Sequence, residues 1–338
     1  MRIVYPLLSG LLALTALEAC GSDDKVLDPD EETDAGGDGD GDGDGDGDGD
    51  GDGDGDGDGD GGAAVVGDGD APSTMAKDTD CDLNGVWAGR QVTRSEALSA
   101  GQFASNWYYL ELAQDGENVV VKKHYDCGVE VKGTVNVKLT PATVEALMKH
   151  NVQTGRKGTM KKQNGACVFT MERFWSVRGA NESKYRPTGA AASMDIAAIA
   201  ASNPLPDKDH TDGAEDWDND GDLGTAWQVT GIVSGTRNTV QRDWTEWFSD
   251  DTHAITPSAD WKSDLVVRAR FNNEENVITP TVGLITQLST ADAAAKHTLT
   301  LQFLGRTTTD SRAKAIIKAK DFDTCMAIQK ALPAPDKL

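Results

Sequence analysis

The stretch from Trp107 to Tyr125, WYYLELAQDGENVVVKKHY, carries a strong β-hairpin signal. Residues 107–112 and 119–125 are rich in aromatic and β-branched side chains, which favour β-strands. Asp115-Gly116 lies between these two runs and is a common signal for a tight hairpin turn. The segment therefore predicts two antiparallel strands joined by a short turn.

The same reading, extended in both directions, predicts further strands bounded by turn residues. Together with the first hairpin, these make about nine to eleven strands. One segment, residues 141–150, instead predicts a helix, with Thr140 as its N-cap and Pro141 at the first helical position. Residues 313–320 fit a strand or a helix, and residues 325–331 favour a helix. The additional expected strands are 83–92, 129–139, 168–178, 225–234, 239–248, 261–271 and 298–304.

Strands that follow one another along the chain in this way are expected to form a mainly β, antiparallel domain with one or two short helices. Two architectures remain open, a closed barrel, which removes exposed strand edges, and a β-sandwich. The tripeptide Gly85-Val86-Trp87 resembles the G-x-W motif of lipocalins and related calycin barrels. The resemblance implies a calycin-like barrel in which Trp87 plugs one end.

The negative charge of the chain is concentrated before this domain. Of the formal charge of −24, residues 21–80 supply −21, from 23 acidic residues against Lys25 and Lys77. Residues 81–338 carry 32 acidic and 29 basic residues, or −3, so they predict no nucleic-acid partner. Strict Gly-Asp alternation from Gly37 to Gly61 offers no apolar side chain to bury and predicts a disordered tether. The expected order is therefore a signal peptide (1–19), a tether (20–80) and an outer domain (81–338).

The N-terminus carries an export signal. Met1-Arg2 precedes an apolar run, residues 3–17, that is shorter than the about 20 residues needed to span a bilayer. The run ends Leu17-Glu18-Ala19-Cys20, which resembles the lipobox of bacterial lipoproteins, with Glu18 in place of the usual small residue. The resemblance implies cleavage before Cys20 and acylation of that residue. It further implies a lipid anchor in the outer membrane, facing the periplasm or the cell surface.

Four cysteines remain after Cys20, and an even number in an exported chain predicts two disulfides. Three pairings are compatible with the sequence. The expected one joins Cys127 to Cys167, on either side of the predicted helix, and Cys81 to Cys325, which would tie the ends of the domain together. A Cys₄ zinc site is disfavoured because no two cysteines have C-x-x-C spacing.

The acidic segment 216–222, DWDNDGD, resembles the first half of a calcium-binding loop. Its carboxylates alternate, so they can converge on one ion, and Gly221 permits a sharp turn. Position twelve of such a loop should be a bidentate Glu but is Trp227, so Asp212, Glu215 or a carboxylate distant in the sequence would have to complete the site. A structural calcium ion and a solvated acidic turn are both open, and no other cofactor is expected. The candidate ligands are Asp216, Asp218, Asp220 and Asp222.

No catalytic arrangement stands out. The five histidines form no pair with metal-ligand spacing, and His124 is expected to be a hydrogen-bonded or exposed strand residue. Ser249 and His253 flank two aspartates, but no G-x-S-x-G motif is present. Trp244 and Trp247 should face opposite sides of one strand, one toward the core and one outward. The outward Trp is expected to be an incidental surface residue, and a sugar- or lipid-binding face is the alternative. The five histidines are His124, His150, His210, His253 and His297.

These patterns favour a binding or structural module over an enzyme. The expected function is that of a membrane-anchored cell-envelope lipoprotein. Its partners would be the lipid bilayer, reached through acylated Cys20, and a small apolar ligand, a glycan or another envelope protein. The alternative is a secreted hydrolase whose active site has no recognised motif.

Overall fold

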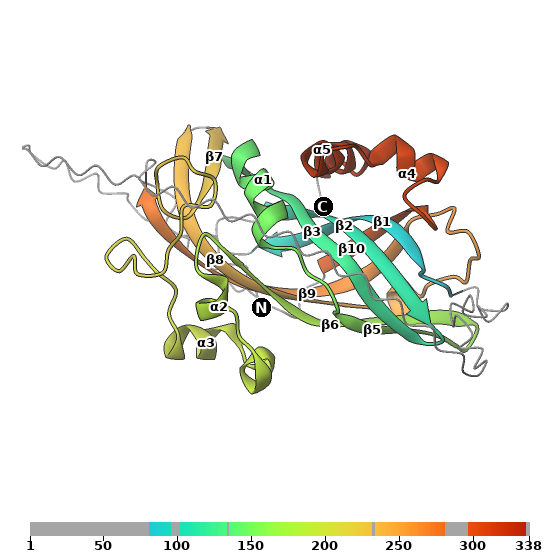
Figure 1. Cartoon of the computed structure of the whole chain (residues 1–338). Coiled ribbons are helices and arrows are strands. Elements are labelled where there is room, and N and C mark those ends of the chain that lie inside the picture. Colours follow the sequence, from blue (N-terminus) through green and yellow to red (C-terminus); the bar gives the residue numbers. More distant parts are fainter. Residues whose placement is uncertain (1–80, 96–101, 134, 232–233, 281–296, 336–338) are drawn as a thin grey trace, which may run out of the picture. The chain divides into compact units, whose positions relative to one another are not determined.

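The computed structural model describes residues 81–95, 102–133, 135–231, 234–280 and 297–335. The export signal, Cys20 and the Gly-Asp tether lie outside these ranges. The described part is mainly β, and its ten strands form one antiparallel sheet with a few short helices around it (Figure 1). None of the helices in this part is both long and apolar enough to cross a membrane.

The expected hairpin is longer than its sequence signal. Its strands are β2 (Gln102–Asp115) and β3 (Asn118–Lys132), which pair along almost their whole length. The other strands are β1 (Gly85–Ser95), β4 (Val135–Leu139), β5 (Lys157–Gln163), β6 (Ala166–Arg178), β7 (Thr225–Gly231), β8 (Gly235–Phe248), β9 (Leu265–Pro280) and β10 (His297–Gly305).

The sheet closes into a barrel. Each neighbour in the order β2-β1-β10-β9-β8-β6-β5-β3 is hydrogen-bonded to the next, and β3 pairs again with β2. A second route, β3-β4-β7-β8, completes the wall farther along the long strands β3 and β8. Strands β5 and β6 therefore flank one end of the barrel, and β4 and β7 flank the other. Of the two architectures left open by the sequence, these pairings describe the barrel.

The end flanked by β5 and β6 has an apolar interior. Successive side chains of a strand point to opposite faces, so every second residue enters the barrel. Trp87, Leu110, Phe169, Trp247 and Leu299 come from five different strands and belong to one buried cluster. The side chain of Trp87 is fully buried there, and its Nε1 donates to the carbonyl of Leu83 at 3.0 Å.

Helices cover two regions of the outer barrel surface. Helices α1 and α5 pack apolar residues against the outward side of β2 and β3, and α4 packs against β10. The shorter α2 and α3 lie beside β6, β8 and β9, on the opposite side in Figure 1. The helix bounds are α1 Pro141–His150, α2 Glu182–Tyr185, α3 Ile196–Ser202, α4 Ser311–Ile316 and α5 Asp321–Ala331, with 3₁₀ turns η1 Gly189–Ser193 and η2 Asp251–His253.

The predicted helix 141–150 is confirmed as α1, with its N-terminus at the expected place. Pro141 is in the first turn, and the side chain of Thr140 accepts a hydrogen bond from the backbone of Thr143. Helix α1 connects β4 to the segment that leads into β5, so it lies where the wall changes from one route to the other. The residues just after α1 are thereby placed beside the middle of β3.

The expected disulfide pairing is wrong. The structure joins Cys81 to Cys167 and Cys127 to Cys325. Cys81 precedes β1 and Cys167 is the second residue of β6, and both lie in the apolar cluster of the β5–β6 end. Cys127 faces outward from β3, where the register against β2 shifts, and it meets α5 on the outer surface. The cysteines are therefore paired by the positions of their strands and helix in the fold, and the order of the cysteines along the chain does not predict these pairs.

Candidate functional site

The middle of the barrel has a polar and charged interior. Successive side chains of β8 alternate between the two faces of the sheet. Trp244 points outward, so Gln241, Asp243 and Thr245 share the inner face with Trp247. All three are buried. Their strand neighbours, by contrast, pack against helices outside the barrel. The charged groups therefore lie within the wall of strands, and each one requires a partner to offset its loss of hydration.

Arg178 supplies the central partner. Its guanidinium donates to Asp243 through Nη1 and to Asp126 through Nη2, at 2.5 and 3.0 Å. Nη1 also donates to the side-chain oxygen of Gln241 at 3.0 Å. The two carboxylates come from β8 and β3, and the arginine comes from β6. One guanidinium thus connects β3, β6 and β8.

The residues after α1 complete this network. The amide of Asn151 donates to Asp126 Oδ2 at 2.9 Å and to Ser176 Oγ at 2.6 Å. Two residues later, Gln153 pairs with His124 of β3 through backbone hydrogen bonds. Asn151, Ser176 and Asp126 are each nearly inaccessible to solvent. The short segment between α1 and β5 therefore contributes side chains to the interior, although it is not a strand at this point.

Burial controls the protonation of this network. It raises the pKa of Asp243 to about 6, against the opposing effect of Arg178. For His124, burial and the charges of Arg156 and Arg178 hold the pKa well below its usual value. Its Nε2 is 3.7 Å from Asp126, outside hydrogen-bond range, and neither ring nitrogen has a hydrogen-bond partner in the described structure. The expectation of a hydrogen-bonded or exposed His124 is therefore wrong.

Arg156 is a second buried arginine near His124. Its guanidinium carbon lies 3.9 Å from the ring centre of Phe174 and 4.1 Å from that of Trp247. These aromatic faces attract a cation. No carboxylate forms an ion pair or hydrogen bond with Arg156 within the ranges described above, and burial lowers its pKa to about 9.

A small cavity of about 40 Å³ lies toward the β4–β7 end. By the volume that one internal water requires, it accommodates about three waters or a ligand of a few heavy atoms. Its wall combines apolar groups from β2, β3, β7 and β9 with amide and charged groups from β2, β6, β8 and β9. The lining residues are Ala104, Asn106, Val129, Val131, Arg178, Trp227, Gln241, Phe271, Asn273 and Glu275.

Two polar groups at this cavity suit small polar ligands. Asn106 Oδ1 is buried and accepts no hydrogen bond within the described ranges. Glu275 accepts from Arg237 Nη2 at 2.8 Å, and both side chains are 2% exposed. The cavity therefore presents a hydrogen-bond acceptor and a neutralised ion pair beside aromatic and aliphatic walls.

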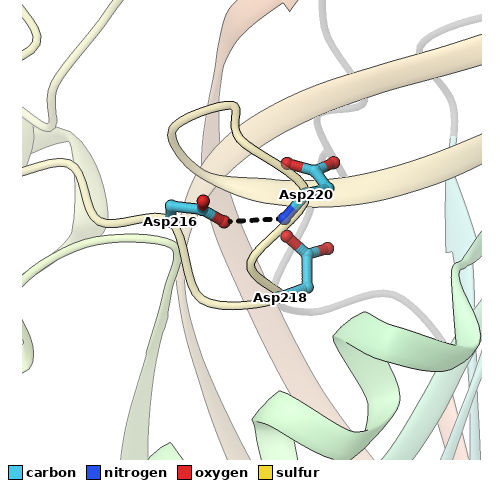
Figure 2. A group of neighbouring side chains, drawn as sticks. All are labelled: Asp216, Asp218 and Asp220. Carbon is cyan, nitrogen blue, oxygen red and sulfur yellow. Dashed lines mark hydrogen bonds between the residues drawn. The ribbon is translucent and has the colours of Figure 1, made fainter.

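The acidic loop between α3 and β7 brings together three of the four predicted calcium ligands. Oxygens of Asp216, Asp218 and Asp220 lie within 4.8 Å of one another (Figure 2). Asp218 Oδ2 accepts from the hydroxyl of Thr143 and from the backbone of Ala226, whereas its Oδ1 is buried without a hydrogen-bond donor. Carboxylate oxygens in this arrangement suit Ca²⁺.

The remaining predicted ligands are not in this group. Asp222 donates its backbone N–H to Asp220, and Asp212 pairs with Lys184. Glu215 accepts hydrogen bonds from Asn181, which precedes α2, and from Trp217 of the loop, and Trp227 enters the barrel. The calcium site stays a prediction, because the three carboxylates also fit the solvated acidic turn that the sequence left open.

The serine–histidine arrangement considered from the sequence does not form. Ser249 Oγ accepts from the backbone N–H of Phe169 at 2.9 Å. The carboxylate of Asp250 and the hydroxyl of Thr252 both approach His253 at Nδ1, at 3.1 and 2.9 Å. Burial opposes the charge of Asp250, but hydrogen bonds from Arg268, Thr252 and His253 hold its pKa below the usual value. These groups stabilise the turn after β8.

Trp244 is not an exposed binding residue. It faces outward from β8 as predicted, but Ile196 and Ile199 of α3 pack over it, and only 2% of its surface is exposed. The guanidinium of Arg173 lies 3.8 Å from its ring centre. The alternative prediction of a sugar- or lipid-binding face at Trp244 is therefore wrong. Helix α3, which the sequence did not predict, covers this residue.

Taken together, the described residues form a closed antiparallel barrel with one apolar end, a charged centre and a small cavity toward the other end. Comparison of the chain with family models, curated proteins and solved structures finds no match. The lipobox and calycin resemblances stay predictions.

Proposed function

We propose that this protein is a lipid-anchored lipoprotein of the bacterial outer membrane whose barrel binds a small polar molecule. The anchor part of the proposal is supported by the apolar run that ends at Cys20 and by the Gly-Asp segment after it. Two or more acyl chains hold a protein on a membrane far more firmly than one. A flexible polyanion of this length would place the barrel roughly 45 Å from the anchor.

The binding part is supported by one observation, the cavity toward the β4–β7 end. Its 40 Å³ volume favours a compact ligand over a lipid or a long sugar. The free acceptor of Asn106 favours a ligand that donates a hydrogen bond. The rings of Trp227 and Phe271 supply apolar contact. A small molecule with hydroxyl or amide N–H donors fits these three features.

The anchor is tested by expressing the full chain in a bacterial host and measuring the intact mass of the mature protein. The expected mass begins at Cys20 and includes acyl chains, and the protein partitions into the detergent phase. Cys20→Ser should remove the acyl mass and move the protein to the aqueous phase. A wild-type chain without acyl mass would refute the anchor while leaving the barrel proposal intact.

The cavity is tested by native mass spectrometry of the full chain recovered from cells. Ala104 lines the cavity, so Ala104→Leu fills it. Val152, 44% exposed, provides the control Val152→Leu. Wild type and Val152→Leu should carry a bound molecule that Ala104→Leu lacks, with all three equally folded by circular dichroism. A bound mass that persists in Ala104→Leu would place the ligand elsewhere, and no bound mass in wild type would count against this function.

The alternative of a secreted hydrolase has no supporting arrangement in the described residues, as the positions of Ser249 and His253 illustrate. Reaction with a fluorophosphonate probe that labels serine hydrolases would favour it.

A further inference from the structure

The interior of the barrel contains two buried polar side chains, Arg156 and His124, that pack against the same two aromatic rings and make no side-chain hydrogen bonds within the described residues. Arg156 is 8% exposed, and Nε, Nη1 and Nη2 all have no acceptor. His124 is 1% exposed, and neither ring nitrogen has a partner. A buried donor left without an acceptor is destabilising, and more so when the group is charged.

Aromatic rings hold these two groups in one place. Trp247 and Phe174 contact both, with ring centres 5.8 and 5.1 Å from that of His124. The same two rings lie against the guanidinium of Arg156. Tyr108 packs on His124 from β2, 5.1 Å between ring centres. Rings offer a cation an attractive face but no hydrogen-bond acceptor, so the five N–H donors of the guanidinium stay unused.

We propose that Arg156, with the neighbouring ring of His124, binds a small monovalent anion, a halide or a carboxylate, inside the barrel. A guanidinium presents donors in a planar fork that matches a carboxylate or encloses a halide. His124 is neutral and therefore keeps one N–H that can donate to the same anion. This site is formed by other residues than the cavity and does not depend on the proposed function.

The surrounding charges determine how the site responds to pH. Arg178 carries one positive charge between Asp126 and Asp243, so this trio has a net charge of −1 when all are ionised. The positive charge of Arg156 offsets the net charge of this trio. The titratable groups whose charges raise the pKa of Arg156 are Tyr108, Asp126 and the exposed Glu172. An anion on Arg156 restores the excess negative charge. Protonation of Asp243, whose pKa is raised to about 6 by burial, removes it again. The anion should therefore bind more tightly below pH 6.

Arg173 provides a matched control. It is also stacked on an indole, 3.8 Å from the ring centre of Trp244, but on the outer face of the barrel. Its donors are used by Glu246 and by the backbone of Met194, at 2.8 and 3.1 Å. Arg173→Met therefore removes a stacked arginine without touching the proposed anion site.

The first test measures the melting temperature of the full chain in sodium bromide, sodium formate and sodium gluconate at equal ionic strength. The melting temperature of wild type and of Arg173→Met should rise with the concentration of bromide or formate and then reach a plateau. The rise should be larger at pH 5.5 than at pH 8. Gluconate is too bulky to enter the barrel and should cause no such rise. Arg156→Met should lose the saturable rise, and Arg156→Lys should keep part of it. An equal response in Arg156→Met and wild type would overturn the proposal.

The second test needs no variant. Crystals of the wild-type chain grown in bromide should show an anomalous peak within 3.5 Å of a guanidinium nitrogen of Arg156. A formate at the same nitrogen, in crystals grown in formate without halide, would show that the site also binds a carboxylate. Ordered water only at Arg156, in both crystals, would overturn the proposal.

Discussion

The guanidinium of Arg178 donates to the carboxylate of Asp243 inside the barrel, where both side chains are 3% exposed. This contact joins β6 to β8 at the level where the wall changes from one strand route to the other. A buried ion pair contributes little compared with an apolar pair of the same shape, but the loss of one partner leaves a charge without compensation.

Arg178→Met is accordingly expected to lower the free energy of unfolding by about 3–5 kcal/mol. The variant leaves the carboxylates of Asp126 and Asp243 close together in a buried site. Introducing Asp243→Asn into Arg178→Met should restore part of the loss, because one of the two buried charges is then absent. Denaturation in urea, followed by tryptophan fluorescence, measures both effects. The control is Lys208→Met, which removes an exposed pair with Asp209 and should leave the midpoint unchanged. Equal midpoints for Arg178→Met and Lys208→Met would contradict the structural role of Arg178.

His124 should make the protein less stable in mild acid. Its pKa in the folded protein is well below the usual value of 6.5, so below pH 6.5 the unfolded chain binds a proton that the folded chain does not. The stabilisation is complete above pH 6.5 and falls as the pH decreases, by at most about 1.4 kcal/mol per pH unit. The urea midpoint of wild type should fall between pH 7.5 and pH 5 more than that of His124→Gln. His210→Gln serves as the control, because the His210 side chain is 85% exposed. The same pH dependence in all three proteins would exclude His124 as the group responsible.

The disulfide pairing can be verified directly. Proteolysis under non-reducing conditions should release linked peptides that contain Cys81 with Cys167 and Cys127 with Cys325. The chain-entropy model predicts about 5 kcal/mol of stabilisation for loops closed over separations of 86 and 198 residues. Replacing both cysteines of either pair by serine should therefore lower the melting temperature clearly. A linked peptide that contains Cys127 and Cys167 would contradict the structure.

Calcium binding at the acidic loop is tested by thermal unfolding with excess Ca²⁺ or with a chelator. If the three carboxylates hold an ion, wild type should melt at a higher temperature in Ca²⁺, and Asp218→Ala should lose this difference. In chelator, Asp218→Ala is also expected to be less stable than wild type. The Asp218 carboxylate accepts hydrogen bonds from Thr143 and Ala226 whether or not an ion is bound. Asp222→Ala, outside the group of three, should respond to Ca²⁺ as wild type does. A wild-type melting temperature that does not depend on Ca²⁺ would leave the loop as a solvated turn.

Local sequence signals predicted the elements well where one pattern determines the structure. The hairpin around Asp115-Gly116 and the helix starting at Pro141 follow from turn and capping preferences within a few residues. The predicted strand 129–139 was only partly right, because β3 ends at Lys132 and β4 begins at Val135. Strand β5 was not predicted, because its sequence has no alternation of apolar and polar residues. Met160 is the one buried residue in this strand.

The interior charges were not predicted, and the physical reason is general. In the segment 237–247, an alternating pattern with Arg, Thr, Gln, Asp and Thr on one face reads as a strand with a solvated side. Barrel closure turns that side inward, and the partner of Asp243 is Arg178 on β6, 65 residues away along the chain. Arg156 lies in a short polar segment with no regular pattern of its own. Long-range pairing, which no local pattern records, positions both groups.

The two disulfides overlap along the chain, since Cys127 lies between Cys81 and Cys167, while Cys325 lies beyond both. A single peptide-bond cleavage at any point from Asp82 to Thr324 consequently yields two pieces that remain covalently linked. One nick by a surface protease would leave the particle at its full mass on a non-reducing gel and separate it into fragments only after a thiol is added. With the proposed lipid anchor at Cys20, the barrel would thus stay attached after such damage.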